Sequence, residues 1–130
     1  MSVEIVMTPE RCEEIIEELE AVSRVQAVPA RDKVSMILPP NSNLVHTKAM
    51  LERELVTAFR IHNVEATIQR CIEIVDSMIL TGDGIRPGRN GVAIFVGGGL
   101  EHVFNVSAVP FDTSMYLVDN RFHTHAIPRL

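Results

Sequence analysis

Residues 92–109 read VAIFVGGGLEHVFNVSAV, and this stretch predicts a β-hairpin. Its first part, Val92 to Val96, is an unbroken apolar run of the kind that forms a buried strand. Three glycines, Gly97 to Gly99, follow the run and supply the positive φ angles that a tight hairpin turn needs. His102 to Val109 is rich in residues typical of strands and predicts the returning arm. The carboxyl-terminal part of the chain is therefore expected to form a sheet.

Two more stretches extend the predicted sheet to four strands. Lys33 to Leu38 is a short, mostly apolar run, and the two prolines that follow it can continue neither a helix nor a strand ladder. Ser114 to Val118 is the fourth strand candidate, because Pro110 and Asp112 mark a turn before it. The sequence leaves the strand directions open, so the sheet is expected to be mixed or antiparallel.

The first helix is predicted to begin at the sequence Thr8-Pro9-Glu10. Threonine is a good N-cap residue, proline fits the first helical position, and an acidic side chain is favourable in the first turn. Five apolar side chains follow at helical spacing: Cys12, Ile15, Ile16, Leu19 and Val22. They predict an amphipathic helix with one buried face.

The stretch between Pro40 and Gly82 contains neither glycine nor proline, but its apolar face changes direction part of the way along. The earlier face consists of Leu44, Leu51, Leu55, Ala58 and Phe59, and the later one of Ile68, Cys71, Ile72, Val75 and Ile79. A single straight helix could not bury both faces. We therefore predict an antiparallel helical hairpin with a polar tip at Arg60 to Val64, where Asn63 can adopt a left-handed turn conformation.

These elements predict one domain of the α+β class, covering residues 1–130. Its four-stranded mixed or antiparallel sheet is expected to be covered by helices, with the helical hairpin protruding. The length is well below the roughly 250 to 300 residues at which chains usually divide. Since the chain is 46% hydrophobic with one Tyr and no Trp, the core is expected to be aliphatic.

The net charge of −5 arises entirely from residues 1–30, which hold seven acidic side chains and only two basic ones, Arg11 and Arg24. From residue 31 to 130 there are ten acidic and ten basic side chains. This balance lacks the basic stripe with which an independent nucleic-acid-binding domain displaces counterions. DNA is therefore not an expected partner, and affinity for free RNA is expected to be weak.

The sequence also predicts where the protein resides. Cys12 and Cys71 lie on predicted apolar helix faces, which suits reduced thiols in the cytosol better than a disulfide framework. No stretch reaches the roughly 18 apolar residues of a membrane span. The start, MSVEIVMTPE, lacks the basic region and cleavage site of a signal peptide. A cytoplasmic protein without a membrane partner is therefore expected.

No set of residues predicts catalysis or a cofactor. His123 and His125 could bind a metal together with His102 or Asp119, but histidines without a recognised ligand spacing are more often surface residues. The loop at residues 83–91 lacks the Gly-Lys-Ser/Thr ending of a phosphate-binding loop and precedes a strand. No Ser/His/Asp or Cys/His signature is present. We therefore predict a non-enzymatic protein with no metal and no cofactor.

Two surface features are candidates for binding a partner. The acidic side chains Glu13, Glu14, Glu17, Glu18 and Glu20 are expected to form the solvated face of the first helix or, alternatively, a docking surface. At the hairpin tip, Arg60, His62 and Asn63 project hydrogen-bonding groups from the end of two helices. Such a tip can enter a groove of another molecule.

The run TSMYLVDNRFHT, Thr113 to Thr124, resembles the end of the N-terminal domain of archaeal and eukaryotic class-one peptide chain release factors. In that family the motif is Tyr, any residue, Cys, any three residues, and Phe. Three earlier stretches are similar to the same domain and occur in the same order: Ser35 to Pro40, Thr57-Ala58, and Asn90-Gly91-Val92 before an apolar strand. The resemblance covers nearly the whole chain.

In that family the domain enters the ribosomal A site, where a hairpin tip with the sequence Asn-Ile-Lys-Ser helps to recognise the stop codon. The resemblance places Arg60-Ile61-His62-Asn63 at this tip, Ala30-Arg31-Asp32 at a Gly-Thr-Ser loop, and Val118 at the motif cysteine. It also implies that Glu54 and Tyr116 correspond to groups that read the codon. The RNA-binding residues that it implies are Glu54, Arg60, Ile61, His62, Asn63, Tyr116, Asp119, Asn120 and Phe122.

The resemblance thus implies a role in translation termination or in a related rescue or quality-control step. The expected partners are the ribosome and mRNA, with downstream release-factor domains or a GTPase as further partners. Because the tip residues differ from those of the family, A-site binding with and without stop-codon specificity are both open. Peptidyl-tRNA hydrolysis in the family needs a Gly-Gly-Gln motif, which these 130 residues lack. The alternative is a protein-interaction module that retained the fold but lost RNA contact, using the acidic first helix or the sheet edge.

Overall fold

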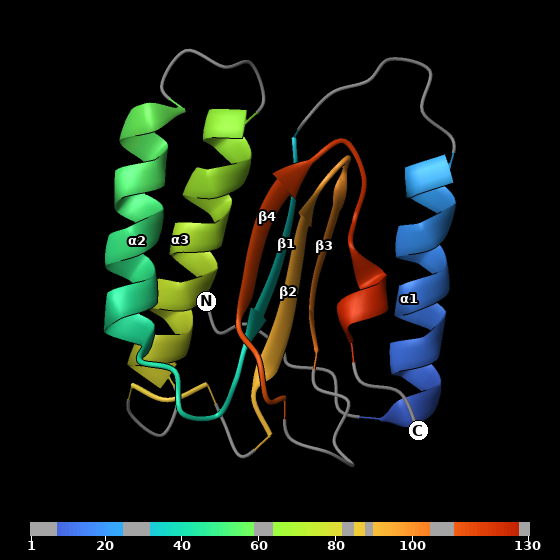
Figure 1. The fold of residues 1–130 in the computed structure, drawn as a ribbon, viewed down its shortest axis with the longest axis horizontal. Helices are drawn as coiled ribbons and strands as arrows, with labels where there is room; N and C mark the ends of the chain where they lie inside the picture. Colours follow the sequence, from blue (N-terminus) through green and yellow to red (C-terminus); the bar gives the residue numbers. More distant parts are fainter. Residues whose placement is uncertain are drawn as a thin grey trace.

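The computed structural model describes residues 8–24, 32–58, 64–81, 85–87, 90–104 and 111–127 of the chain. Within them, three α-helices, four strands and a short 3₁₀-helix form an α+β domain, which confirms the predicted class (Figure 1). The order is α1 (Pro9–Arg24), β1 (Lys33–Leu38), α2 (Leu44–Thr57), α3 (Val64–Thr81), β2 (Val92–Gly97), β3 (Leu100–Phe104), β4 (Met115–Asp119) and η1 (Thr124–Ala126).

The four strands form one antiparallel sheet in the order β3-β2-β1-β4. The predicted hairpin is confirmed, since β2 pairs with β3 and places Phe95 opposite His102. β1 lies between β2 and β4, so Ser35 has Phe95 on one side and Leu117 on the other. Of the two sheet types that the sequence leaves open, the structure has the antiparallel one.

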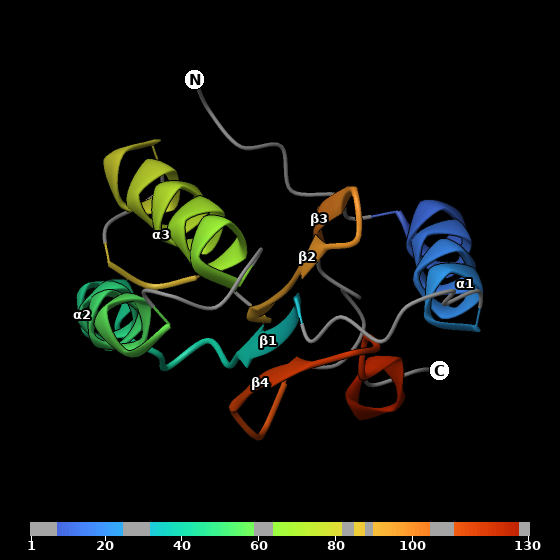
Figure 2. The same cartoon turned by 90° about the horizontal axis from the view of Figure 1, so that it is seen from above.

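Helices cover both faces of the sheet (Figure 2). The α2–α3 pair lies on one face, while α1 and η1 lie on the other. Because successive strand residues point to opposite faces, Val34, Met36 and Leu38 of β1 pack with the α2–α3 pair, and Ile37 packs with α1. Every residue of β1 and β2 is buried, which explains why both strands have nearly unbroken apolar sequences.

The first helix buries the face that its sequence predicts. Its core side chains Cys12, Ile15, Ile16 and Leu19 are at most 1% exposed. They pack in one cluster with Phe95 and Phe104, whose rings stack at a centroid distance of 5.7 Å. Burial of apolar surface between α1 and the sheet is therefore what holds this helix in place.

The break in the long stretch without glycine or proline is confirmed, since α2 ends at Thr57 and α3 begins at Val64. The two helices run in opposite directions, as the colours of Figure 1 show. Their buried side chains include Leu44, Leu51, Ile68, Cys71, Ile72 and Val75, and Ala58, which directly follows α2, is also buried. Residues 59–63, which include the predicted tip, lie outside the described residues. None of the described helices is both long enough and apolar enough to cross a bilayer.

The turn between β2 and β3 uses its glycines as predicted. Gly97, Gly98 and Gly99 have φ angles of 135°, 56° and 82°. At Gly97 an added Cβ would lie 2.4 Å from the carbonyl oxygen of Asp32, so the close approach of two backbones also requires glycine there. Residues 105–110 lie outside the described residues, so the predicted extension of the returning strand to Val109 stays a prediction.

Candidate nucleic-acid interface

One end of the domain, at the top of Figure 1, gathers segments that lie far apart in the sequence. We call it the hairpin end: the last turn of α2, the first turn of α3, the β2–β3 turn, the start of β1 and the end of β4. The strand register supports this arrangement, since Lys33 at the start of β1 lies opposite Asp119 at the end of β4. The predicted tip residues Arg60, Ile61, His62 and Asn63 lie outside the described residues, so their role stays a prediction.

Glu54 and Tyr116 interact electrostatically, although one belongs to a helix and the other to a strand. Glu54 lies in the last turn of α2, and Tyr116 of β4 packs against the cluster between the sheet and the α2–α3 pair. Burial raises the pKa of the Tyr116 hydroxyl, and the negative charge of Glu54 raises it further. At neutral pH Tyr116 therefore presents a neutral hydroxyl, which can both donate and accept a hydrogen bond.

The Tyr116 hydroxyl is shielded from solvent and has no hydrogen-bond partner in the described part of the chain. A buried polar group without a partner costs about 1–3 kcal/mol. Tyr116→Phe removes this atom and keeps the ring, so we expect the free energy of unfolding to rise by about 1 kcal/mol. Urea denaturation measures the change, with Tyr116→Leu as the control that also loses the ring. A clear loss of stability in Tyr116→Phe would contradict the expectation.

Asp119 and Asn120 lie where β4 ends, and both are partly buried. One carboxylate oxygen of Asp119 accepts a hydrogen bond from the Asn120 backbone N–H at 2.7 Å. The other lies 2.9 Å from Nε2 of His123, whose backbone N–H donates to Ser35 Oγ at 2.8 Å. His123 thus ties the Asp119 carboxylate to the middle of the sheet. Sequence reasoning considers His123 only as a metal ligand, although its spacing of four residues from Asp119 is a signal of this contact.

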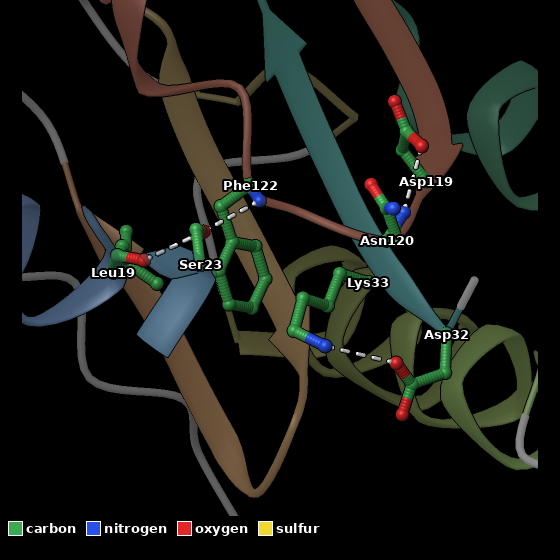
Figure 3. Close-up of polar contacts among 7 residues, drawn as sticks. All are labelled: Leu19, Ser23, Asp32, Lys33, Asp119, Asn120 and Phe122. Carbon is green, nitrogen blue, oxygen red and sulfur yellow. Dashed lines mark hydrogen bonds and ion pairs between the residues drawn. The ribbon is translucent and has the colours of Figure 1, made fainter. Parts of the chain in front are cut away.

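Phe122 occupies the core. The residue is 4% exposed, and its ring meets that of Phe95 edge-on at a centroid distance of 5.9 Å. Its backbone N–H donates to Ser23 Oγ at 2.9 Å, and Ser23 donates to the carbonyl oxygen of Leu19 at 2.8 Å (Figure 3). Phe122 therefore anchors the segment after β4 to α1, and its ring has no open face on which a base could stack.

Lys33, which the sequence pattern assigns only to a strand, is a buried cation at the hairpin end. The residue is 5% exposed, and its Nζ donates to Oδ1 of Asp32 at 3.1 Å (Figure 3). A Cβ built on Gly98 would lie 3.0 Å from Cε of Lys33, so the lysine passes directly beneath the β2–β3 turn. The positive charge of Lys33 and the negative charge of Asp32 therefore neutralise each other at the hairpin end. In the sequence, this ion pair is indicated by an aspartate directly before the single lysine of an otherwise mostly apolar strand.

The other candidates for chemistry have structural contacts. The rings of His123 and His125 meet at a centroid distance of 5.6 Å. Among the described residues there is no group of three His, Cys, Asp or Glu side chains that could hold a metal. His102 instead lies 3.4 Å from the carboxylate of Glu18. From the loop at residues 83–91, Arg86 donates to a backbone carbonyl oxygen just before α2 at 2.6 Å.

Both cysteines are free and buried, as their helix faces predict. Burial raises the pKa of the Cys71 thiol to about 12. Burial also raises the pKa of Cys12, and the charge of Glu13 adds to the effect. A thiol with a raised pKa stays protonated near neutral pH and is a poor nucleophile. The cysteines therefore act as core side chains.

The outer face of α1 is acidic. Glu13, Glu14 and Glu17 are exposed to solvent. Glu20, in contrast, is partly buried and accepts a hydrogen bond from Thr124 Oγ1 at 3.2 Å, which links α1 to η1. The predicted solvated face of the helix is thus present, and one of its glutamates has a structural contact.

No protein-family model matches the chain, but its sequence is similar to curated release factors. It is 30% identical over 110 residues to the eukaryotic peptide chain release factor subunit 1 of Caenorhabditis elegans, and 29% identical over 110 residues to the protein of that name from Podospora anserina. Both alignments cover 75% of this chain. They cover 18% and 24% of the relatives, so the chain spans about a fifth to a quarter of the curated proteins that it matches.

Two solved structures share the fold. A structure described as an archaeal protein superposes with a TM-score of 0.73 at 18% identity, over 94% of this chain and 35% of that one. An archaeal translation termination factor superposes with a TM-score of 0.63 at 21% identity, over 87% of this chain and 32% of that one.

Proposed function

This chain is a release-factor-1-like domain, and from that premise we propose that it acts in translation termination or in a related rescue or quality-control step. The domain binds the ribosomal A site and turns its hairpin end toward mRNA. It has no hydrolytic activity of its own, and it corresponds to the N-terminal domain of a release factor. Peptide release, where it occurs, requires further release-factor domains, and a GTPase is a further partner.

The observation that carries the proposal is where the described site residues lie. Glu54 lies in the last turn of α2, and Asp119 and Asn120 lie at the end of β4, so these three residues belong to the hairpin end. Tyr116 lies further along the sheet, opposite Met36, and the charge of Glu54 raises the pKa of its hydroxyl. Carboxylate and amide groups offer donors and acceptors that distinguish the edges of unpaired bases. The proposed tip, Arg60 to Asn63, stands between α2 and α3 in the sequence.

The charge distribution supports binding within a larger assembly. The chain has a net charge of −5, and Lys33 at the hairpin end is already paired with Asp32. Attraction to RNA phosphates is then proposed to come from Arg60 at the tip, from the exposed Arg121 next to Asn120, and from attached release-factor domains. Linked binding surfaces raise the overall affinity in this way because the second contact becomes intramolecular.

Co-sedimentation with archaeal ribosomes tests the proposal. The chain is mixed with ribosomes that carry a stop or a sense codon in the A site, at low and at moderate salt. We expect Arg60→Glu to weaken binding about tenfold or more, because the reversed charge repels the RNA backbone. The control is Arg53→Glu, the same charge reversal on the exposed surface of α2, which should bind as the wild type does.

The outcomes separate the versions of the proposal. Stop-dependent binding supports decoding, whereas codon-independent binding supports a rescue or quality-control role. Equal ribosome binding by the wild type and Arg60→Glu would refute contact through the tip. Absence of any A-site footprint, with the natural downstream domains attached, would refute the proposal as a whole.

A protein-interaction module is the second candidate function, and the exposed acidic face of α1 favours it. On this alternative, a partner with a basic surface contacts Glu13, Glu14 and Glu17. Complex formation would then be insensitive to Arg60→Glu but would be weakened by Glu13→Lys together with Glu17→Lys.

A further inference from the structure

A polar pocket of about 330 Å³ lies between the last turns of α1 and the segment that follows β4. Its polar lining residues are Glu20, Ser23, Arg121, His123, Thr124 and His125. The pocket also touches Phe122, which packs in the same cluster as α1, whereas Tyr116 packs on the α2–α3 face of the sheet. The pocket is therefore separate from the surface that Glu54 and Tyr116 form.

Hydrogen bonds hold the inner wall of this pocket in place. The backbone N–H of Phe122 donates to a serine hydroxyl of α1 at 2.9 Å, a contact drawn in Figure 3. The backbone N–H of His123 donates to a serine hydroxyl of β1 at 2.8 Å, and Thr124 Oγ1 donates to the Glu20 carboxylate of α1 at 3.2 Å. Three consecutive residues are thus bound to α1 or β1. The pocket has its shape before a ligand arrives, so binding costs less conformational entropy.

The mouth of the pocket carries hydrogen-bond donors. Arg121 and His125 are exposed to solvent, whereas Thr124 between them in the wall is buried. Within the described ranges of the chain, the guanidinium of Arg121 has no hydrogen-bond or ion-pair partner. The ring of His125 meets that of His123 at a steep angle, with centroids 5.6 Å apart. A guanidinium and an imidazole N–H both donate to phosphate oxygens, so the mouth suits an anionic group with several acceptors.

The carboxylate of Glu20 restricts which anion fits, because it lines the same pocket. Repulsion between like charges grows with the charge of the ligand. A phosphodiester carries one negative charge, whereas inorganic phosphate carries up to two near neutral pH. The pocket therefore suits the backbone of a nucleic acid better than a free phosphate ion. Arg121 directly follows Asn120 of the hairpin end, so RNA is the nucleic acid that the proposed function brings to it.

We propose that this pocket binds one phosphodiester of an RNA strand, with Arg121 and His125 donating to its oxygens. The proposal rests on the proposed function, because the hairpin end brings the pocket to the RNA of the ribosome. It adds a contact on the α1 face of the sheet, on the side opposite to Tyr116. Phosphate contacts position a protein on a nucleic acid and carry no sequence information. Binding at this pocket is therefore independent of the codon.

Titration of the 130-residue chain with a short single-stranded RNA at low salt, followed by NMR, tests the pocket without ribosomes. We expect the imidazole resonances of His125 to shift. Arg121→Gln should weaken binding about threefold to tenfold, and it should lower the slope of log K against log salt by about 0.7, the value for one lost phosphate contact. The control is Arg53→Gln, which removes an exposed arginine of α2 and should change neither quantity. Inorganic phosphate should shift His125 less than the RNA does.

Photo-cross-linking on the ribosome tests the same contact in the assembly. Replacing His125 by benzoylphenylalanine should give cross-links to RNA with a stop or a sense codon alike. The control is the same replacement at Leu80, which is 76% exposed on α3 and should give none. Circular dichroism checks that all variants are folded.

The two experiments separate this proposal from the proposed function. If the wild type binds ribosomes but the His125 position cross-links only to protein, the pocket proposal fails and the proposed function stands. If the wild type does not bind ribosomes, the proposed function fails, and the RNA titration still decides whether the pocket binds a phosphodiester. No shift of His125 at about 1 mM RNA, equal effects of Arg121→Gln and Arg53→Gln, or tighter binding of inorganic phosphate than of RNA would overturn the pocket proposal.

Discussion

Asp32→Ala is expected to lower the free energy of unfolding by about 3 kcal/mol, although Asp32 belongs to neither hydrophobic cluster. The side chain of Lys33 is 6% exposed, and the Asp32 carboxylate lies 3.1 Å from its Nζ. Without this carboxylate, the ammonium group would stay beneath the β2–β3 turn and lose the partner that offsets its lost hydration. Removing one partner of a buried ion pair is costly for this reason.

The double variant Asp32→Ala/Lys33→Met provides the matched control. Replacing both partners of a buried pair with apolar groups is often neutral, so we expect the double variant to regain most of the stability that Asp32→Ala loses. Chemical denaturation of the wild type, the two single variants and the double variant gives the coupling energy directly. A loss below about 1 kcal/mol in Asp32→Ala would mean that Lys33 finds water or another partner.

Gly97→Ala is expected to destabilise the domain by about 3 kcal/mol or more, for two reasons that add. The φ angle of Gly97 is 135°, a conformation that residues with a side chain rarely adopt. The new Cβ would also lie 2.4 Å from the carbonyl oxygen of Asp32 and 2.8 Å from the Cα of Lys33. These atoms belong to the backbone at the start of β1, so they cannot move aside without disturbing the sheet.

Gly99→Ala separates the two causes. Gly99 also has a positive φ, 82°, but a Cβ built there has no neighbouring atom within 4 Å. Its substitution should therefore cost only the backbone strain, about 1 kcal/mol. Thermal unfolding of both variants gives the comparison. Equal losses of stability in the two variants would show that strain alone decides the effect and that the backbone of β1 yields to the added methyl group.

Local patterns in the sequence account for most of the fold. The apolar run before the three glycines predicts β2 and its turn, and the change of apolar face between Pro40 and Gly82 predicts two helices. Both signals depend only on neighbouring residues, because helices and strands repeat their side-chain directions over a few positions. Strand limits are less well defined, and β4 spans Met115–Asp119 where the pattern predicts Ser114 to Val118.

Local sequence patterns do not predict which residues surround an individual site residue. Phe122 lies within the motif that resembles release factors, yet its ring packs in the core against Phe95. Lys33 has the sequence of a strand residue, yet it is held as a buried cation. In each case the environment depends on a segment distant in the sequence, such as β2 or the β2–β3 turn, and no local pattern encodes which distant segment will lie there.

By itself, the sequence determines the class of the domain, its helical hairpin, its glycine turn and its similarity to release factors. These properties follow from the order and spacing of residue types, which fix local conformation and apolar faces. The tertiary structure decides that β1 lies between β2 and β4, which brings Lys33 opposite Asp119 and sets Glu54 near Tyr116. It also places β4 at one edge of the sheet. Strand order is settled by how two helical layers and one sheet bury their apolar faces together, and that is a property of the whole chain.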